Sequence, residues 1–140
     1  MSRREARVAA MQVMYRNILR DRPGDASNDA MMEVLDMIEN DDISVEDVRY
    51  SRSLIDGVEQ HADTIDSVIA DSISASWTVD RLPIVDLCVL RIAIFEILYR
   101  DDIPDAVAAS EAVDMAFKYS TDDASSYING ILRKVIDSKS

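Results

Sequence analysis

Residues 84–99 read IVDLCVLRIAIFEILY, and this stretch decides the fold class. Apolar side chains fill nearly every position, and Asp86, Arg91 and Glu96 are the main exceptions. A helix that is apolar on almost all sides is typical of one surrounded by its neighbours. The run is also too short and too charged to span a bilayer. We therefore expect the central core helix at 84–99, and no membrane segment.

The segments on either side of this stretch also have helical periodicity. Apolar residues recur at three and four positions, and three glycines and three prolines leave little turn material. The sequence therefore predicts an all-α protein, a single compact bundle of about seven helices over residues 1–140. A chain of 140 residues with 48% hydrophobic and 30% charged composition can bury one continuous core.

Caps and breakers predict where the helices end. The first helix should begin near Arg3, because Ser2 and Glu5 fit the S-x-x-E capping box. Its apolar stripe is expected to include Met11, Tyr15 and Ile18. Turn, cap and proline signals predict further breaks at 22–25, 40–44, 61–63, 77–83, 101–104 and 120–123.

Two glycines fall inside predicted helices. Gly57 and Gly130 occupy positions where glycine costs about 1 kcal/mol relative to alanine. We therefore expect each of them to mark a close helix crossing.

Basic residues concentrate at the N-terminus. Residues 1–22 hold six arginines and two acids, a net +4, whereas residues 23–140 hold nine bases and 25 acids, a net −16. The whole chain has a net charge of −12 and repels nucleic acid at long range. A polyanion site is therefore expected at the N-terminus, on arginines drawn from Arg3, Arg4, Arg7, Arg16, Arg20 and Arg22.

Motifs that support catalysis are missing from the sequence. It contains no G-x-x-x-x-G-K, G-x-G-x-x-G or G-x-S-x-G motif. The single histidine, His61, and the single cysteine, Cys88, cannot assemble a zinc site of nitrogen and sulfur ligands. We expect no enzyme activity, no metal site and no cofactor, with His61 at a surface or cap and Cys88 in the core. One cysteine allows no internal disulfide, which favours a reducing cytoplasm.

Three blocks of sequence follow one another in an ordered pattern. RREAR at 3–7 leads into AMQVMY at 10–15, and WTVDRL at 77–82 is followed by VDLCVLRIAIFEIL at 85–98. The third block comprises DIP at 102–104, EAV at 111–113 and YINGIL at 127–132. Together these motifs resemble the NusB family of bacterial transcription antitermination factors, over essentially the whole chain.

The resemblance implies a compact all-helical fold without catalysis. Members of the family bind the boxA element of nascent ribosomal-operon RNA, which is single-stranded, together with NusE, a ribosomal protein of the small subunit. The pair helps to assemble an antitermination complex on RNA polymerase. Asp86 matches the family position that faces NusE. The positions implied to form the RNA surface are Arg3, Arg4, Arg7, Tyr15, Tyr119, Asp123 and Tyr127.

Each assignment has a structural alternative. The N-terminal arginines could lie on a solvated, frayed helix end, where the helix dipole opposes positive charge by roughly 0.3–1 kcal/mol each. Tyr119 and Tyr127 could be partly buried side chains instead of surfaces for base stacking. Asp86 could form a local pair with Arg91.

Two departures from the family pattern reduce the expected affinity for RNA. Glu5 interrupts what is often a longer arginine run, and Ser126 stands where some relatives have lysine. Fewer cations predict weaker and less salt-sensitive binding, so NusE is expected to supply further contacts. A protein-interaction or homodimerisation module with weak RNA binding is the first alternative function. An enzyme with an unrecognised carboxylate site is the second.

Overall fold

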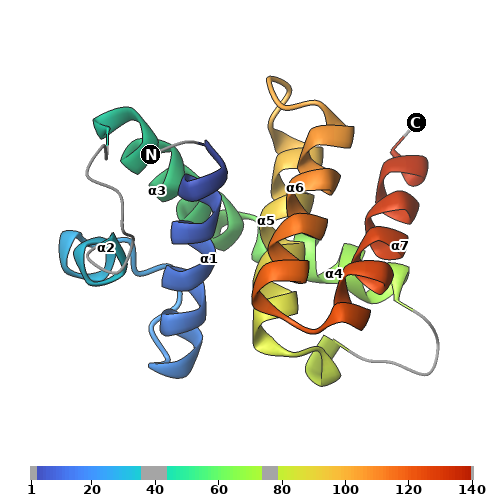
Figure 1. The fold of residues 1–140 in the computed structure, drawn as a ribbon, viewed down its shortest axis with the longest axis horizontal. Helices are drawn as coiled ribbons and strands as arrows, with labels where there is room; N and C mark the ends of the chain where they lie inside the picture. Colours follow the sequence, from blue (N-terminus) through green and yellow to red (C-terminus); the bar gives the residue numbers. More distant parts are fainter. Residues whose placement is uncertain (1–2, 36–43, 74–78, 140) are drawn as a thin grey trace. The chain divides into compact units, whose positions relative to one another are not determined.

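A computed structural model describes residues 3–35, 44–73 and 79–139 (Figure 1). These residues form α-helices and one short 3-10 helix, with no strand among them, which confirms the all-α prediction. None of the helices in these ranges combines the length and apolar character needed to cross a membrane. The elements are α1 (Arg3–Leu19), α2 (Asn28–Leu35), α3 (Val45–Gln60), α4 (Ala62–Ser72), η1 (Val79–Arg81), α5 (Ile84–Tyr99), α6 (Asp105–Tyr119) and α7 (Asp122–Ser138).

The chain divides into two compact units, Met1–Gln60 and His61–Ser140. In the first unit, α1 packs against both α2 and α3. Met11 is buried as expected, but Tyr15 and Ile18 are each 37% exposed. The predicted stripe was therefore partly wrong, because small residues on another side of α1 form the buried face: Ala6, Ala9, Ala10 and Val13.

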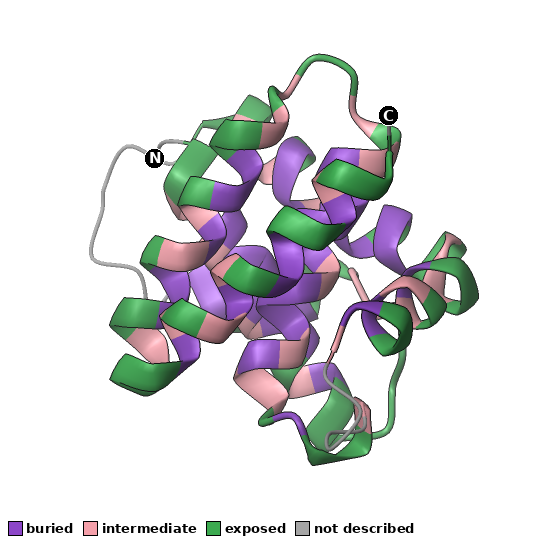
Figure 2. Ribbon diagram, turned by 90° about the vertical axis from the view of Figure 1, so that its right-hand side faces the viewer, coloured by how far each residue is buried: buried purple, intermediate pink, exposed green. Residues whose placement is uncertain are grey.

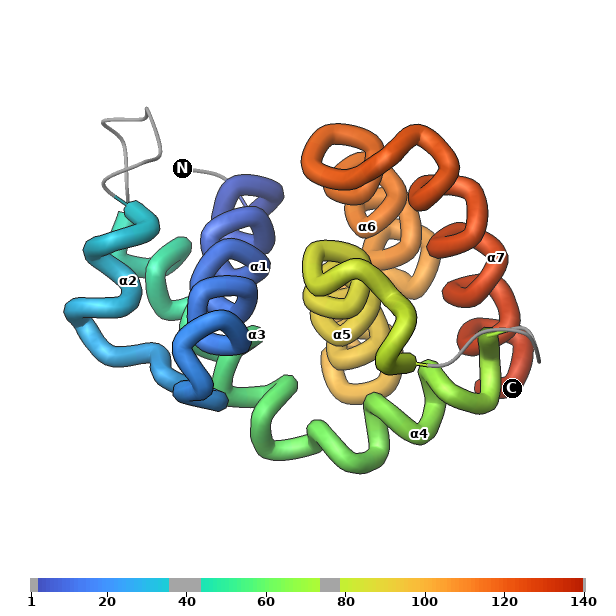
Figure 3. The backbone as a smooth tube through the Cα atoms, turned by 90° about the horizontal axis from the view of Figure 1, so that it is seen from below, coloured from blue at the N-terminus to red at the C-terminus, as the bar shows by residue number. Residues whose placement is uncertain are grey.

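In the second unit, α5 packs against α4, α6 and α7 (Figure 3). Leu90, Ile92 and Ile94 are each fully buried, and Glu96 is 1% exposed. Figure 2 shows buried positions along the sides of the helices that face their neighbours. The expectation of a central core helix at 84–99 is confirmed within this unit. The prediction of a single domain over 1–140 stays a prediction.

Most of the predicted helix ends are confirmed where the structure describes them. The Ser44 hydroxyl accepts from the Asp47 backbone N–H at 3.1 Å, and the Thr121 hydroxyl accepts from that of Ala124 at 3.3 Å. His61 separates α3 from α4. Pro104 lies directly before α6, at the end of the break predicted at 101–104. Ser2 and the breaks expected at 40–43 and 77–78 lie outside the described residues.

The connection between α1 and α2 contains a turn at 22–25 that depends on Gly24. The φ of Gly24 is +75°, in the left-handed region that favours glycine, and Asp21, earlier in the connection, has a φ of 51°. A Cβ at Gly24 would lie 2.8 Å from Cγ of Glu59 on α3. Gly130 differs, because a Cβ there meets nothing within 4 Å. The expectation of a close helix crossing at Gly130 was therefore wrong.

The two glycines predict opposite effects of the same substitution. Gly24→Ala should lower the free energy of unfolding by about 1 kcal/mol or more, since alanine is strained at positive φ and clashes with Glu59. Gly130→Ala should raise it by about 0.5–1 kcal/mol, because alanine is the better helix former and space is free. Urea unfolding followed by circular dichroism measures both values. Equal effects of the two changes would contradict this interpretation.

Candidate nucleic-acid interface

The arginines of α1 fall into two groups with different surroundings. Arg3, Arg4 and Arg7 occupy the N-terminal part of the helix, and Arg16 and Arg20 lie at its C-terminal end. Arg3 and Arg4 are exposed, whereas Arg7 is only 4% exposed. The two groups therefore differ in what they can offer to a polyanion.

The N-terminal group lies over an aromatic ring from α3. The guanidinium carbon of Arg3 is 3.7 Å from the centroid of the Tyr50 ring, and that of Arg7 is 5.8 Å away. Tyr50 itself is 5% exposed. A guanidinium over a ring face is worth about 0.5–2 kcal/mol, increasing with burial. The ring therefore favours a defined position for Arg3 at the surface of the first unit.

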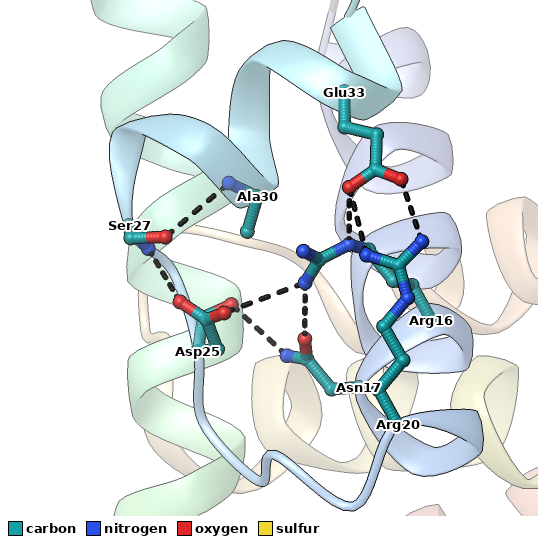
Figure 4. Close-up of polar contacts among 7 residues, drawn as sticks. All are labelled: Arg16, Asn17, Arg20, Asp25, Ser27, Ala30 and Glu33. Atoms are coloured by element: carbon teal, nitrogen blue, oxygen red, sulfur yellow. Dashed lines mark hydrogen bonds and ion pairs between the residues drawn. The ribbon is translucent and has the colours of Figure 1, made fainter.

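The C-terminal group is bound to carboxylates of its own unit (Figure 4). Arg16 Nε donates to Glu33 Oε2 at 2.7 Å, and Arg20 donates to both Glu33 oxygens at 2.7 and 3.0 Å. Arg16 also reaches Asp25 at 3.4 Å. These ion pairs hold α2 to α1. Two of the six arginines considered for RNA binding are therefore engaged in stabilising the unit.

The same network orders the turn between α1 and α2. The buried Asn17 amide donates to the backbone carbonyl of Asp25 at 3.0 Å. The Asp25 carboxylate accepts from the Ser27 backbone N–H at 3.0 Å, and the Ser27 hydroxyl accepts from that of Ala30 at 3.2 Å (Figure 4). Hydrogen bonds from Ser27, followed by those from Arg16, lower the pKa of Asp25. The turn and the start of α2 are therefore fixed together.

The remaining predicted RNA residues are divided between the two units. Tyr15 is on α1 of the first unit and is 37% exposed. Tyr119 ends α6 and is half-buried, with the Lys118 ammonium 5.3 Å from its ring. Asp123 is exposed, and the half-buried Tyr127 lies one turn further along α7. The second unit therefore brings an acceptor and an aromatic ring onto one face of α7.

Tyr127 borders a cavity of about 300 Å³ in the second unit. The cavity is bordered on the same side of α7 by Gly130 and Lys134, and the Lys134 ammonium donates to the Ser72 carbonyl at 3.3 Å. Tyr119 and Tyr127 are both half-buried, as their structural alternative predicted.

Asp86 on α5 is fully buried. Burial raises the pKa of its carboxyl, and the Ser120 side chain partly offsets this, although neither carboxylate oxygen has a well-formed hydrogen bond. The structural alternative, a local pair with Arg91, is wrong, because Arg91 forms a bidentate pair with Asp66 at 2.9 Å. The contact of Asp86 with NusE stays a prediction, and the burial of this side chain does not suit direct contact.

Comparison with known proteins decides the family. A model of the NusB family matches residues 4–137. The chain belongs to the NusB family. The transcription antitermination protein NusB of Salinispora arenicola is 40% identical over 136 residues, which cover 97% of this chain and 96% of the relative.

Solved structures agree with this NusB assignment. T. maritima NusB superposes with a TM-score of 0.80 at 27% identity, covering 98% of this chain and 92% of that chain. A crystal structure of the antitermination factors NusB and NusE in complex with dsRNA superposes with a TM-score of 0.77 at 26% identity. That alignment covers 99% of both chains. The sequence resemblance to the NusB family is therefore confirmed.

Two side chains considered for chemistry have structural roles in this NusB-family chain. The His61 ring stacks on Tyr99, with centroids 3.8 Å apart and planes 13° apart. Burial raises the pKa of the Cys88 thiol to about 12, so the thiolate form is suppressed near neutral pH. Within the described residues, no group of three or more potential metal ligands is present.

Sequence reasoning missed Tyr50 as the aromatic partner of Arg3 and Arg7. Tyr50 is far from Arg3 in sequence and lies on another helix. The aromatic position in a predicted helix was visible, but its arginine partners become apparent only when α1 and α3 pack together.

Glu33 should give the first unit a distinct response to acid. Hydrogen bonds from Arg20 and Arg16 lower its pKa from 4.5 to about 2. Because the folded pKa is the lower one, the stabilisation is complete above about pH 4.5 and is lost as the pH falls towards 2. Glu33→Gln should therefore lower the free energy of unfolding at pH 7, and its difference from the wild type should shrink across that window.

The matched control for this prediction is Glu46→Gln, at an exposed glutamate of α3. Urea unfolding across a pH series gives the free energy of unfolding of the wild type, Glu33→Gln and Glu46→Gln at each pH. A difference between wild type and Glu33→Gln that stays constant from pH 7 to pH 2 would contradict the role of the ion pairs.

Proposed function

We propose that this chain is a transcription antitermination factor that binds the boxA element of ribosomal-operon leader RNA together with NusE. In this role it helps to assemble the antitermination complex on RNA polymerase. The observation that carries the proposal is the exposed pair Arg3 and Arg4 at the start of α1, in a chain whose net charge is −12. Membership of the NusB family supports it.

The distribution of charge explains why the site is local. Glu33 and Asp25 engage two of the six N-terminal arginines, Arg16 and Arg20, which leaves fewer cations for a phosphate chain. Exposed guanidinium groups bind phosphates through paired N–H donors. Arg3 and Arg4 therefore make the first contacts with RNA, against long-range repulsion from the rest of the molecule.

For the second unit taken by itself, we propose stacking and hydrogen-bonding contacts with RNA. Single-stranded RNA is recognised largely by stacking of splayed bases and by hydrogen bonds to their edges. Tyr119 and Tyr127, both half-buried, are proposed to stack on bases, and the exposed Asp123 carboxylate is proposed to accept from an amino group of a base. Tyr15 lies about three turns after Arg3 and Arg4 on α1 and is proposed as a further RNA contact of this helix.

NusE is the proposed protein partner. One solved relative is a NusB–NusE complex with dsRNA. A partner that adds cations offsets the acidic character of this chain, so RNA binding should strengthen when NusE is present. The Asp86 side chain is buried. We therefore propose that it contacts NusE only if the residues around α5 rearrange.

The proposed role is that of a non-enzymatic adaptor in the cytoplasm, without cofactor or metal. His61 is occupied in aromatic stacking and Cys88 is buried, so neither suits catalysis. The adaptor acts by holding RNA and protein in one assembly.

A protein-interaction module is the second candidate function, and a groove between α6 and α7 favours it. The groove has a volume of about 600 Å³ and includes Val113 and Ile136 among its apolar lining. Asp105, Asp114, Asp137 and Arg133 also line it, and Asp105 forms an ion pair with Lys139 at 3.0 Å. Its apolar lining with carboxylates in excess of cations suits a protein segment better than RNA.

The RNA site is tested by reversing the exposed charges at the start of α1. Arg3→Glu with Arg4→Glu should weaken binding of a labelled boxA-type RNA at least tenfold near 0.1 M salt, because two phosphate contacts are lost. The slope of log affinity against log salt should fall by about 1–1.5. Arg7 is left intact, since a carboxylate at this buried position endangers folding.

Arg22→Glu serves as the matched control, because Arg22 is exposed beyond the other end of α1. It should change RNA affinity much less than the double substitution. Titrations with and without NusE, beside a scrambled RNA, complete the experiment. An affinity unchanged by NusE would contradict the partner role, and absence of selective binding in both conditions would favour the interaction module.

A further inference from the structure

Tyr50 forms the floor beneath the exposed end of the arginine cluster. Its ring is 5% exposed and belongs to α3, which packs against α1. The Arg3 guanidinium carbon lies 3.7 Å from the ring centroid, which is close to van der Waals contact between the cation and the ring. The ring is thus covered by the arginine instead of by apolar side chains alone.

Arg3 remains accessible although it rests on this ring. The residue is exposed, and the described part of the chain shows no ion pair to Arg3. Arg16 and Arg20 provide the contrast, because carboxylates bind both of them. Arg3 is therefore restrained by an uncharged surface that leaves its positive charge uncompensated.

A restrained, planar cation suits recognition of a nucleobase. Bases that are splayed out of single-stranded RNA stack on aromatic rings and on guanidinium planes. An arginine already placed on a ring loses less side-chain freedom when it binds than a free arginine does. Lysine has no planar group, so it cannot replace arginine in such a stack.

We infer that Tyr50 is a positioning residue of the RNA site, which holds Arg3 as a planar surface on which an unstacked base of single-stranded RNA lies. The order of the stack is the Tyr50 ring, the Arg3 guanidinium and the base. Arg7, at 5.8 Å from the same ring and 4% exposed, borders the stack from below the surface. This inference rests on the proposed function and deepens it.

The geometry can be tested without RNA. In an NMR spectrum, the side-chain protons of Arg3 should be shifted upfield by the ring current of Tyr50. The shift should disappear in Tyr50→Leu and persist in Tyr50→Phe, which keeps the ring. An Arg3 spectrum that is the same in wild type and Tyr50→Leu would overturn the stack.

RNA titrations test the function of the stack. Tyr50→Leu should weaken binding of the labelled boxA-type RNA about tenfold, and Tyr50→Phe should retain most of the affinity. The salt slope should stay the same in both variants, because the number of cations does not change. Arg3→Lys should also lose affinity at an unchanged slope. Circular dichroism and urea unfolding check that each variant folds.

An RNA series with single abasic positions identifies the stacked base. At one position, removal of the base should weaken binding by the wild type but not binding by Tyr50→Leu. The missing base and the missing ring would each remove the same stacking contact. If the wild type binds selectively and Tyr50→Leu or Arg3→Lys binds with the same affinity, the inference about Tyr50 is overturned and the proposed function stands. Equal losses in Tyr50→Phe and Tyr50→Leu would overturn it too. Absence of selective binding by the wild type, with or without NusE, would overturn the proposed function and this inference with it.

Discussion

The burial of α5 is the constraint on which the second unit depends. A helix that is apolar on nearly every side must be covered by other helices, and each large side chain removed from water contributes about 1.5–3 kcal/mol. α4, α6 and α7 provide this cover. The same burial raises the pKa of Asp86 and that of Cys88. Packing of the core helix therefore also buries the Asp86 carboxyl and the Cys88 thiol.

In the first unit, the use of each arginine depends on what lies beside it. Arg16 and Arg20 form ion pairs with Glu33, and these pairs hold α2 against α1. Arg3 meets the ring of Tyr50, which holds the side chain without neutralising it. One helix thus has a structural end and an end suited to binding. In the proposed function, this division leaves a protein of strongly negative net charge with a small basic site for an RNA phosphate.

Local sequence signals predicted where the helices begin and end. They predicted less reliably which face of each helix is buried. Thr121 caps α7 and His61 separates two helices as expected, because capping and breaking act over a few residues. The core face of α1 was placed partly wrong, since Ala6 and Ala10 carry little apolar surface in a sequence pattern. Alanines are buried there because small side chains allow close packing. The predicted close crossing at Gly130 was wrong for a related reason. The sequence does not show whether the space beside a helix is open or filled.

The sequence by itself determined the all-α class, the central helix at 84–99, the N-terminal position of the basic residues and the resemblance to the NusB family. These features depend on periodicity, composition and ordered motifs, which are properties of the chain read in order. Only the tertiary structure decided that Asp66, and not Asp86, pairs with Arg91, that Glu33 engages two arginines, and that Tyr50 lies beneath Arg3. Each of these contacts joins residues from different helices. Their partners are chosen by helix packing, and distance along the chain carries no information about it.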